Sequence, residues 1–310
     1  EVQGNVVIYH LIQRLKDMDI CGEIILVPNC NPIGTNIKAG EYTLGRFDPV
    51  NGTNWNRGYF FDKDAVEHFA KTVTREESIE GIKQRFRAHL SNAIDNKLAE
   101  PWGLGLAQQL NLKLQQMAVN ADFVLDLHNG PVSTRHVYIP EYAKDSAKLF
   151  NIPHCIFIPN VFAGALDEAT FCPWWTLQES IKTNLAREVS FNVEAFTLEM
   201  GSQEVIDFNE GNIDATSILS YLNAKGVLHE CDVKPKVMQR LGVYLKDYKT
   251  LFTNWGGMVE YMAKPSQTVK KGEPLAQILN IDDLDTDNGS RTLEAPCDLI
   301  PILHLSLIHI

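Results

Sequence analysis

Two kinds of hydrophobic spacing alternate along the first 230 residues of the chain. Apolar residues recur at helical spacing from Val6 to Met18, and further helices are predicted at residues 78–96, 104–119, 174–186 and 215–224. Short apolar runs between these segments predict strands at residues 22–28, 123–127, 137–139, 155–158 and 195–200, the first of them a short buried strand. Such alternation predicts an α/β domain with a mainly parallel mixed sheet and flanking helices.

The pattern changes at about Val233 to short β-like runs that are separated by turns. Gly256-Gly257 and Lys271-Gly272 are two of these turn signals. We therefore predict a first domain over residues 1–230 and a small β-rich domain over residues 231–304.

Composition limits the kinds of partner that the chain can have. The 310 residues are 45% hydrophobic and 22% charged, which is enough for a sizeable core. No apolar run approaches the ~18 residues that a membrane span requires. The net charge of −11 argues against nucleic-acid binding, which needs clustered basic residues. Six cysteines without a Cys-x-x-Cys pair predict a reducing, cytoplasmic location.

We expect neither end of the sequence to be a natural terminus. The first residues from Glu1 resemble the middle of a structural element, so we expect the natural start to lie upstream. Residues 305–310 resemble the translation of a sequencing adapter and are excluded from the prediction of the fold.

Three polar residues follow or end predicted strands. They are Asn31, His128 and Glu199. Because ligands bind outside the carboxyl ends of strands in open α/β sheets, we expect these side chains to share one edge of the sheet. Taken singly, a histidine in the position of His128 is more often structural or solvated than a metal ligand, and Glu199 is more often a carboxylate satisfied by hydrogen bonds than a general base.

A long segment at residues 29–62 contains groups suited to binding an anion. An irregular stretch of this length is usually functional, and its aromatic residues argue against disorder. The Asn56-Arg57 pair could grip a carboxylate, since a guanidinium offers a planar fork of donors. The alternative is a surface Arg57 paired with Asp48 or Asp62.

These features together resemble the succinylglutamate desuccinylase/aspartoacylase family, a branch of the zinc carboxypeptidase-like fold. The resemblance extends from residue 1 to about residue 304 and includes a β-rich tail like that family's lipoyl-like barrel. Its motifs are Glu1-Val2-Gln3-Gly4-Asn5, Asn31-Pro32, Arg46, Asn56-Arg57, Asp126-Leu127-His128 and Leu198-Glu199-Met200-Gly201.

The resemblance implies a catalytic zinc ion, one per chain. Glu1 matches the acidic ligand of the family's His-x-x-Glu motif, and His128 matches the later histidine ligand. The first histidine ligand would lie three positions before Glu1, outside this sequence. Two histidines and a glutamate leave a fourth position for water, as in catalytic zinc sites. Without the upstream histidine, the 310-residue chain is expected to be weakly active or inactive.

The resemblance also implies roles for four residues around the metal. Arg46 corresponds to the arginine that stabilises the developing oxyanion, and Glu199 to the general base. Asn56 and Arg57 correspond to the pair that holds the carboxylate of the substrate.

The predicted function is that of a zinc-dependent hydrolase that removes an acyl group from an N-acyl amino acid or similar small carboxylate, by cleaving an amide or ester bond. Two alternatives stay open: a zinc carboxypeptidase acting on peptides, and a non-catalytic module that binds carboxylates. Residues 171–175 are a candidate wall of the acyl pocket or, alternatively, the packed start of a helix.

Overall fold

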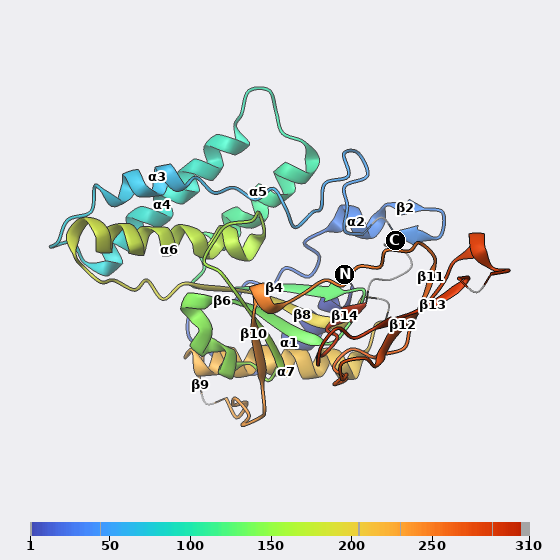
Figure 1. Ribbon diagram of the computed structural model, residues 1–310. Helices are drawn as coiled ribbons and strands as arrows, with labels where there is room; N and C mark the ends of the chain where they lie inside the picture. Colours follow the sequence, from blue (N-terminus) through green and yellow to red (C-terminus); the bar gives the residue numbers. More distant parts are fainter. Residues whose placement is uncertain (1, 44, 204, 230, 287, 305–310) are drawn as a thin grey trace.

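A five-stranded mixed sheet forms the centre of the molecule (Figure 1). The computed structural model describes residues 2–43, 45–203, 205–229, 231–286 and 288–304. The strand order is β10-β7-β6-β8-β4, in which only β6 and β8 run antiparallel. The strands are β4 (Phe123–Gly130), β6 (Arg135–Pro140), β7 (His154–Ile158), β8 (Glu194–Ser202) and β10 (Leu241–Tyr244).

Helices cover both faces of this sheet, which confirms the prediction of a mixed α/β fold (Figure 1). One face packs against α1 (Gln3–Leu15) and α7 (Phe208–Ala224). The other face lies beneath α3 (Lys63–Ala70), α4 (Ile79–Leu98), α5 (Leu106–Ala118) and α6 (Leu166–Leu185). A 3₁₀ segment, η1 (Glu141–Leu149), follows β6. In the part of the chain that is described, every helix is too short or too polar to cross a membrane.

The start of α6 differs from its prediction. The helix begins at Leu166, not at residue 174, and carries Pro173 inside it. Residues 171–174 are buried in the core and residues 171–175 do not line the large cavity described below. The second reading of residues 171–175, as packed helix, is therefore the correct one.

Residues 22–28 are not a strand, and their prediction as a buried strand is wrong. They are extended, and Ile25 is 59% exposed. Among the described residues, no backbone hydrogen bond joins this run to β4, although both line one cavity. Just before it, β1 (Asp19–Ile20) pairs with β9 (Leu228–His229). An apolar run becomes a strand only when a neighbouring strand satisfies its backbone groups.

The C-terminal part of the chain is rich in strands, as predicted. A three-stranded antiparallel sheet is formed by β11 (Met258–Tyr261), β12 (Pro274–Leu279) and β13 (Ser290–Glu294). The last described strand, β14 (Leu303–His304), pairs with β5 (Val132–Ser133). Because β10 joins the central sheet, this part also touches the first domain. The domain division at residue 231 stays a prediction, and residues 305–310 lie outside the described residues.

The remaining elements are short. They are α2 (Pro32–Asn36), β2 (Lys38–Ala39), β3 (Tyr42–Thr43), η2 (Leu245–Asp247) and η3 (Ile281–Asp283).

Candidate active site

The carboxyl ends of β4 and β8 bring two of the predicted residues together. These strands are parallel neighbours, and His128 lies directly beside Glu199 in their register. The ladder is irregular between His128 and Gly130, immediately after this pair. Polar side chains at the carboxyl ends of parallel strands are where α/β sheets bind ligands.

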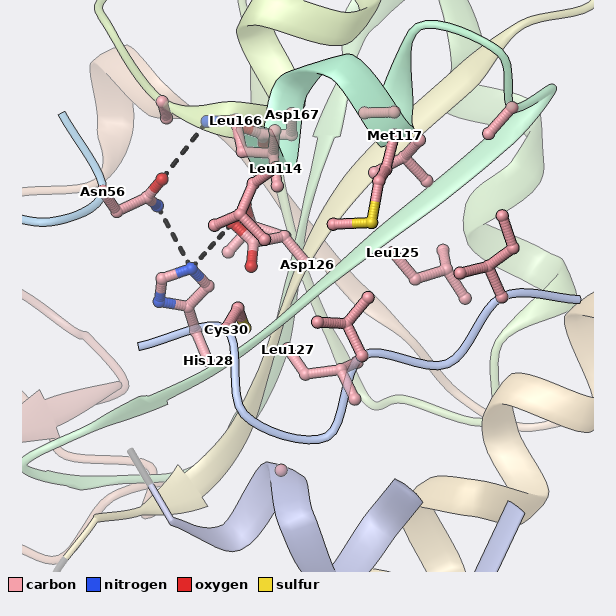
Figure 2. Close-up of a pocket in the computed structure, with 18 of the residues that line it drawn as sticks. Cys30, Asn56, Leu114, Met117, Leu125, Asp126, Leu127, His128, Leu166 and Asp167 are labelled. Carbon is pink, nitrogen blue, oxygen red and sulfur yellow. Dashed lines mark hydrogen bonds and ion pairs between the residues drawn. The ribbon is translucent and has the colours of Figure 1, made fainter. Parts of the chain in front are cut away.

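Two groups converge on the Nε2 atom of His128 (Figure 2). Asp126 Oδ2 lies 2.8 Å away and Asn56 Nδ2 lies 3.1 Å away. Asp126 precedes His128 by two residues on the same strand, so the two side chains share one face. An ionised carboxylate only accepts hydrogen bonds, which favours a tautomer whose Nε2–H donates to Asp126 and whose lone pair is on Nδ1. In that tautomer the Asn56 amide nitrogen, which only donates, lies beside Nε2 without donating to it.

The loop that carries Arg46 and Asn56 is ordered by its own hydrogen bonds. Trp55 N–H donates to the Arg46 carbonyl at 3.0 Å, and Asn56 N–H donates to Asn54 Oδ1 at 3.0 Å. The Asn56 side chain also contacts the start of α6, where its Oδ1 accepts a hydrogen bond from the Leu166 N–H at 3.2 Å. Asn56 therefore lies between the start of α6 and His128.

Arg57 extends from the same loop and is exposed. Its carbonyl accepts a hydrogen bond from Asn111 Nδ2 at 2.6 Å, and its own Nη1 donates to the Asn56 carbonyl at 2.6 Å. Asp48 and Asp62 instead accept from backbone N–H groups at 2.8 and 2.9 Å, and within the described residues neither forms an ion pair with Arg57. The structure does not support the alternative of a surface ion pair for Arg57.

Most of the predicted site residues line one cavity of about 930 Å³. Its polar part is lined by Asn31, Arg46, Asn56, Arg57, His128 and Glu199. Asn31 also caps α2, with its Oδ1 accepting from the Gly34 N–H at 2.9 Å. The other part of the cavity is apolar, with walls from α5 and β4 (Figure 2); these walls include Leu114, Met117, Leu125 and Leu127. Glu1 lies outside the described residues.

A buried carboxyl group lies behind the Asp126–His128 pair. Asp167, at the start of α6, is only 3% exposed and lines the same cavity. Burial, reinforced by the negative charge of Asp126, raises the pKa of Asp167 to about 6. Its Oδ1 accepts a hydrogen bond from the Glu168 N–H at 2.9 Å.

Two tyrosines lie near Glu199. Burial raises the pKa of Tyr138, which lines the cavity, and the charges of Tyr248 and Glu199 raise it further. Burial likewise raises the pKa of Tyr248, with a smaller contribution from Glu199. Tyr248 belongs to the chain that follows β10, so the C-terminal part reaches the site.

Comparisons with known proteins identify the family. A model of the succinylglutamate desuccinylase/aspartoacylase catalytic domain matches residues 1–224. This chain belongs to the succinylglutamate desuccinylase/aspartoacylase family. The description of this model names two enzymes, succinylglutamate desuccinylase and aspartoacylase, and both are deacylases. The site therefore belongs to a family of deacylating hydrolases.

Solved structures agree with this assignment. A family member from Shewanella frigidimarina has 43% sequence identity and a TM-score of 0.93, with 98% of this chain and 81% of that chain covered. One from Shewanella amazonensis has 44% identity and a TM-score of 0.93, with 98% and 83% covered. A succinylglutamate desuccinylase/aspartoacylase from Rhodobacter sphaeroides, at 16% identity and a TM-score of 0.61 over 97% and 75%, shows the fold alone. A search of curated protein sequences finds no match.

The family resemblance implies a zinc ion, and His128, the one implied ligand among the described residues, fits that ion. A metal-bound histidine usually donates its other N–H to a carboxylate, and Asp126 is placed to accept from His128. The Nδ1 edge of the ring points away from Asp126 and Asn56 (Figure 2). In the ranges that the structure describes, no group of three or more His, Cys, Asp or Glu side chains could hold a metal. Two of the three implied ligands, Glu1 and the upstream histidine, lie outside those ranges.

Sequence reasoning did not assign a role to two residues of this family member's site. Asp126 could have been found, since a residue two positions before a histidine on a strand shares its face. Asp167 carries no comparable local signal, because only the tertiary fold places the start of α6 beside β4.

Proposed function

We propose that this family member is a zinc-dependent deacylase that hydrolyses an amide or ester bond of an N-acyl amino acid or similar small carboxylate. One observation carries the proposal. A single cavity contains the Asp126-supported His128, the carboxylate of Glu199 and the guanidinium groups of Arg46 and Arg57. Such a set combines a metal ligand, a base, and cations for an oxyanion and a substrate carboxylate.

We assign the zinc ion to His128, Glu1 and the histidine implied three positions upstream. When bound, zinc would polarise the scissile carbonyl and lower the pKa of a bound water toward ~7. The contribution of Asp126 is to orient the His128 ring through the 2.8 Å contact with Nε2.

The remaining steps belong to side chains of the cavity wall. Glu199 takes a proton from the attacking water and later gives it to the leaving nitrogen or oxygen. Arg46 donates hydrogen bonds to the carbonyl oxygen as negative charge develops there, which by comparison with other oxyanion donors is worth about 3 kcal/mol. Asn56 and Arg57 hold the substrate carboxylate, so that attack occurs within an oriented complex.

The size of the substrate is part of the proposal. Leu245, from η2 in the C-terminal part of the chain, lines the cavity together with the polar residues. A wall from that part restricts access, which favours a small acylated amino acid over a peptide. A peptide substrate would have to pass this wall with its chain extended.

The test uses the chain extended upstream of Glu1 to include the implied histidine. We expect about one zinc per chain by elemental analysis, and hydrolysis of N-acetylaspartate or N-succinylglutamate. Turnover of short peptides alone would replace the proposal with the carboxypeptidase. Absence of both zinc and turnover would favour the module that only binds carboxylates.

The role of Glu199 has its own test. We expect Glu199→Gln to lower kcat at least ~100-fold while zinc content and KM change little, because an amide cannot accept the proton. The matched control is Glu188→Gln, at a side chain that is 83% exposed, which should leave kcat unchanged. Normal turnover by the Glu199 variant would remove this residue from the mechanism.

A further inference from the structure

Four residues with ionisable side chains form a row across four adjacent strands of the central sheet. The register places His128 of β4 beside Glu199 of β8. Glu199 lies directly opposite His136 of β6, and His136 lies beside His154 of β7. Glu199 thus has a histidine on each side, and only one of them, His128, belongs to the implied metal site.

The side chains of Glu199 and His136 point to the same face of the sheet. Residues directly opposite in an antiparallel pair share a face, with their Cβ atoms about 4.5–5.5 Å apart. The alternate residues Val137 and Leu198 pack in the core with α1 and α7, on the other face. His136 and Glu199 therefore lie side by side on the face of the sheet that carries the cavity.

His136 is a neutral imidazole whose protonated nitrogen is identified by its partner. The side chain is fully buried, and Nδ1 lies 2.9 Å from the Thr134 carbonyl oxygen. A carbonyl only accepts, so Nδ1 carries the hydrogen and Nε2 carries the lone pair. Burial lowers the pKa of His136 to about 4, which keeps the ring neutral at physiological pH.

The Nε2 atom of His136 has no hydrogen-bond partner among the described residues. A buried acceptor without a partner is costly and uncommon in folded proteins, so its presence calls for a reason. The register places Glu199 directly opposite His136, and the carboxyl group of Glu199 is a hydrogen donor in its protonated form.

We propose that His136 is a positioning residue for Glu199, whose protonated carboxyl donates a hydrogen bond to the Nε2 lone pair, directly or through one water molecule. This inference rests on the proposed function of Glu199 as the base. The proton comes from the attacking water, stays on a carboxyl oxygen of Glu199, and leaves with the departing group. The imidazole neither gains nor loses a proton, and holds the carboxyl group in one orientation between the two transfers.

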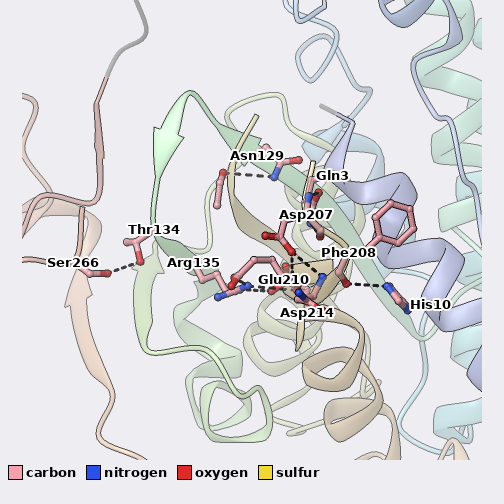
Figure 3. Close-up of polar contacts among 12 residues, drawn as sticks. Gln3, His10, Asn129, Thr134, Arg135, Asp207, Phe208, Glu210, Asp214 and Ser266 are labelled. Atoms are coloured by element: carbon pink, nitrogen blue, oxygen red, sulfur yellow. Dashed lines mark hydrogen bonds and ion pairs between the residues drawn. The ribbon is translucent and has the colours of Figure 1, made fainter. Parts of the chain in front are cut away.

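The backbone beneath His136 is tied to the C-terminal part of the chain. Ser266 Oγ donates to Thr134 Oγ1 (Figure 3). The same Oγ lies 3.0 Å from His154 Nε2. Thr134 supplies the carbonyl that binds His136 Nδ1. These contacts hold the start of β6 in place, so the His136 ring is fixed relative to Glu199.

The first test needs neither metal nor substrate. We would record ¹⁵N NMR signals of the imidazole nitrogens in the wild type, Glu199→Gln and Glu199→Leu, with His136→Gln used to assign the signals. The amide of Glu199→Gln can donate to Nε2 permanently, whereas the leucine variant offers no donor. We expect the Nε2 signal of His136 to differ between these two variants while Nδ1 stays protonated. Identical Nε2 signals in all three proteins would overturn the proposal.

The second test separates positioning from folding. In the zinc-loaded, upstream-extended chain, His136→Phe should lower kcat about tenfold or more with KM changed less than about twofold. His136→Gln, which returns an acceptor near the Nε2 position, should regain most of kcat. The control His68→Gln changes an exposed histidine of α3 and should keep the wild-type kcat.

Thermal unfolding of each variant shows whether it folds. Equal kcat in the folded Phe and Gln variants at His136 would refute positioning. If the wild type hydrolyses none of the acyl substrates, the proposed function fails, and the NMR comparison still decides whether His136 and Glu199 are hydrogen-bonded.

Discussion

Replacing Asp167 with asparagine should stabilise the protein at neutral pH and have no effect in acid. The carboxyl group is 3% exposed, and its burial together with the nearby charge of Asp126 raises its pKa from 3.8 to about 6. Asparagine has the shape of the protonated acid and keeps an oxygen that can accept from the Glu168 N–H. The variant therefore imitates the form of Asp167 that the folded chain prefers.

The magnitude follows from the difference in pKa between the folded and unfolded chains. Between pH 3.8 and about 6 the folded state binds the Asp167 proton more tightly than the unfolded state does. The free energy of unfolding of the wild type consequently falls as pH rises through this window, by about 1.36 kcal/mol per pH unit. Over about two units the loss is about 3 kcal/mol, and the Asp167→Asn variant does not incur it.

The assay is urea unfolding of the wild type and the Asp167→Asn variant from pH 3.5 to pH 8. We expect equal stabilities at the acid end and an advantage for the variant that grows to about 3 kcal/mol above pH 6. Asp17→Asn, at an exposed position of the sequence that follows α1, is the control and should follow the wild type. A stability difference that is independent of pH, or one that favours the wild type at pH 7, would refute the assignment of a raised pKa to Asp167.

Two further predictions concern binding and the buried ion pair. Arg57→Ala should raise KM at least ~10-fold with little change in kcat, because Arg57 holds the ground state and transition state alike; steady-state kinetics with N-acyl amino acids measures this. Lys225→Met should destabilise the fold by about 3 kcal/mol, since it leaves Glu194, whose side chain is 14% exposed, without its cation at 2.6 Å. A urea-unfolding cycle with Glu194→Gln should recover part of that loss, and additive effects would contradict the pairing.

The sequence predicts most of the elements of the central domain but not where two helices begin. The start of α6 was missed because Pro173 reads as a first-turn residue. In the structure the helix begins eight residues earlier than predicted, at Leu166. Glu168 caps this start, because its Oε2 accepts from the Ala163 and Ala165 N–H groups. The start of α7 at Phe208 was likewise missed by seven residues, where Asp207 caps the helix.

The failure at residues 22–28 has a different origin. Its apolar composition is typical of a strand, but strand formation is a property of a pair. β4 is an edge strand whose described partner is β8, and the run at residues 22–28 faces it across the cavity without a shared ladder. Composition could not predict that separation.

The candidate site is predictable where local geometry sets it. His128 and Glu199 end parallel strands, so their convergence follows from the sheet alone. The position of Asn56, by contrast, depends on a hydrogen bond from the Leu166 N–H, 110 residues away. No spacing in the sequence indicates such a contact.

The degree of burial decides which ionisable groups of this site are shifted toward their neutral forms. Burial raises the pKa of Asp167 and lowers that of His136, and both shifts favour the neutral form of the buried group. Charged groups such as Arg57 lie instead on the exposed side of the cavity, where water still solvates them. At neutral pH His136 therefore stays an uncharged hydrogen-bonding group, whereas Asp167, whose pKa is about 6, is mostly ionised there and its charge lowers the stability of the fold.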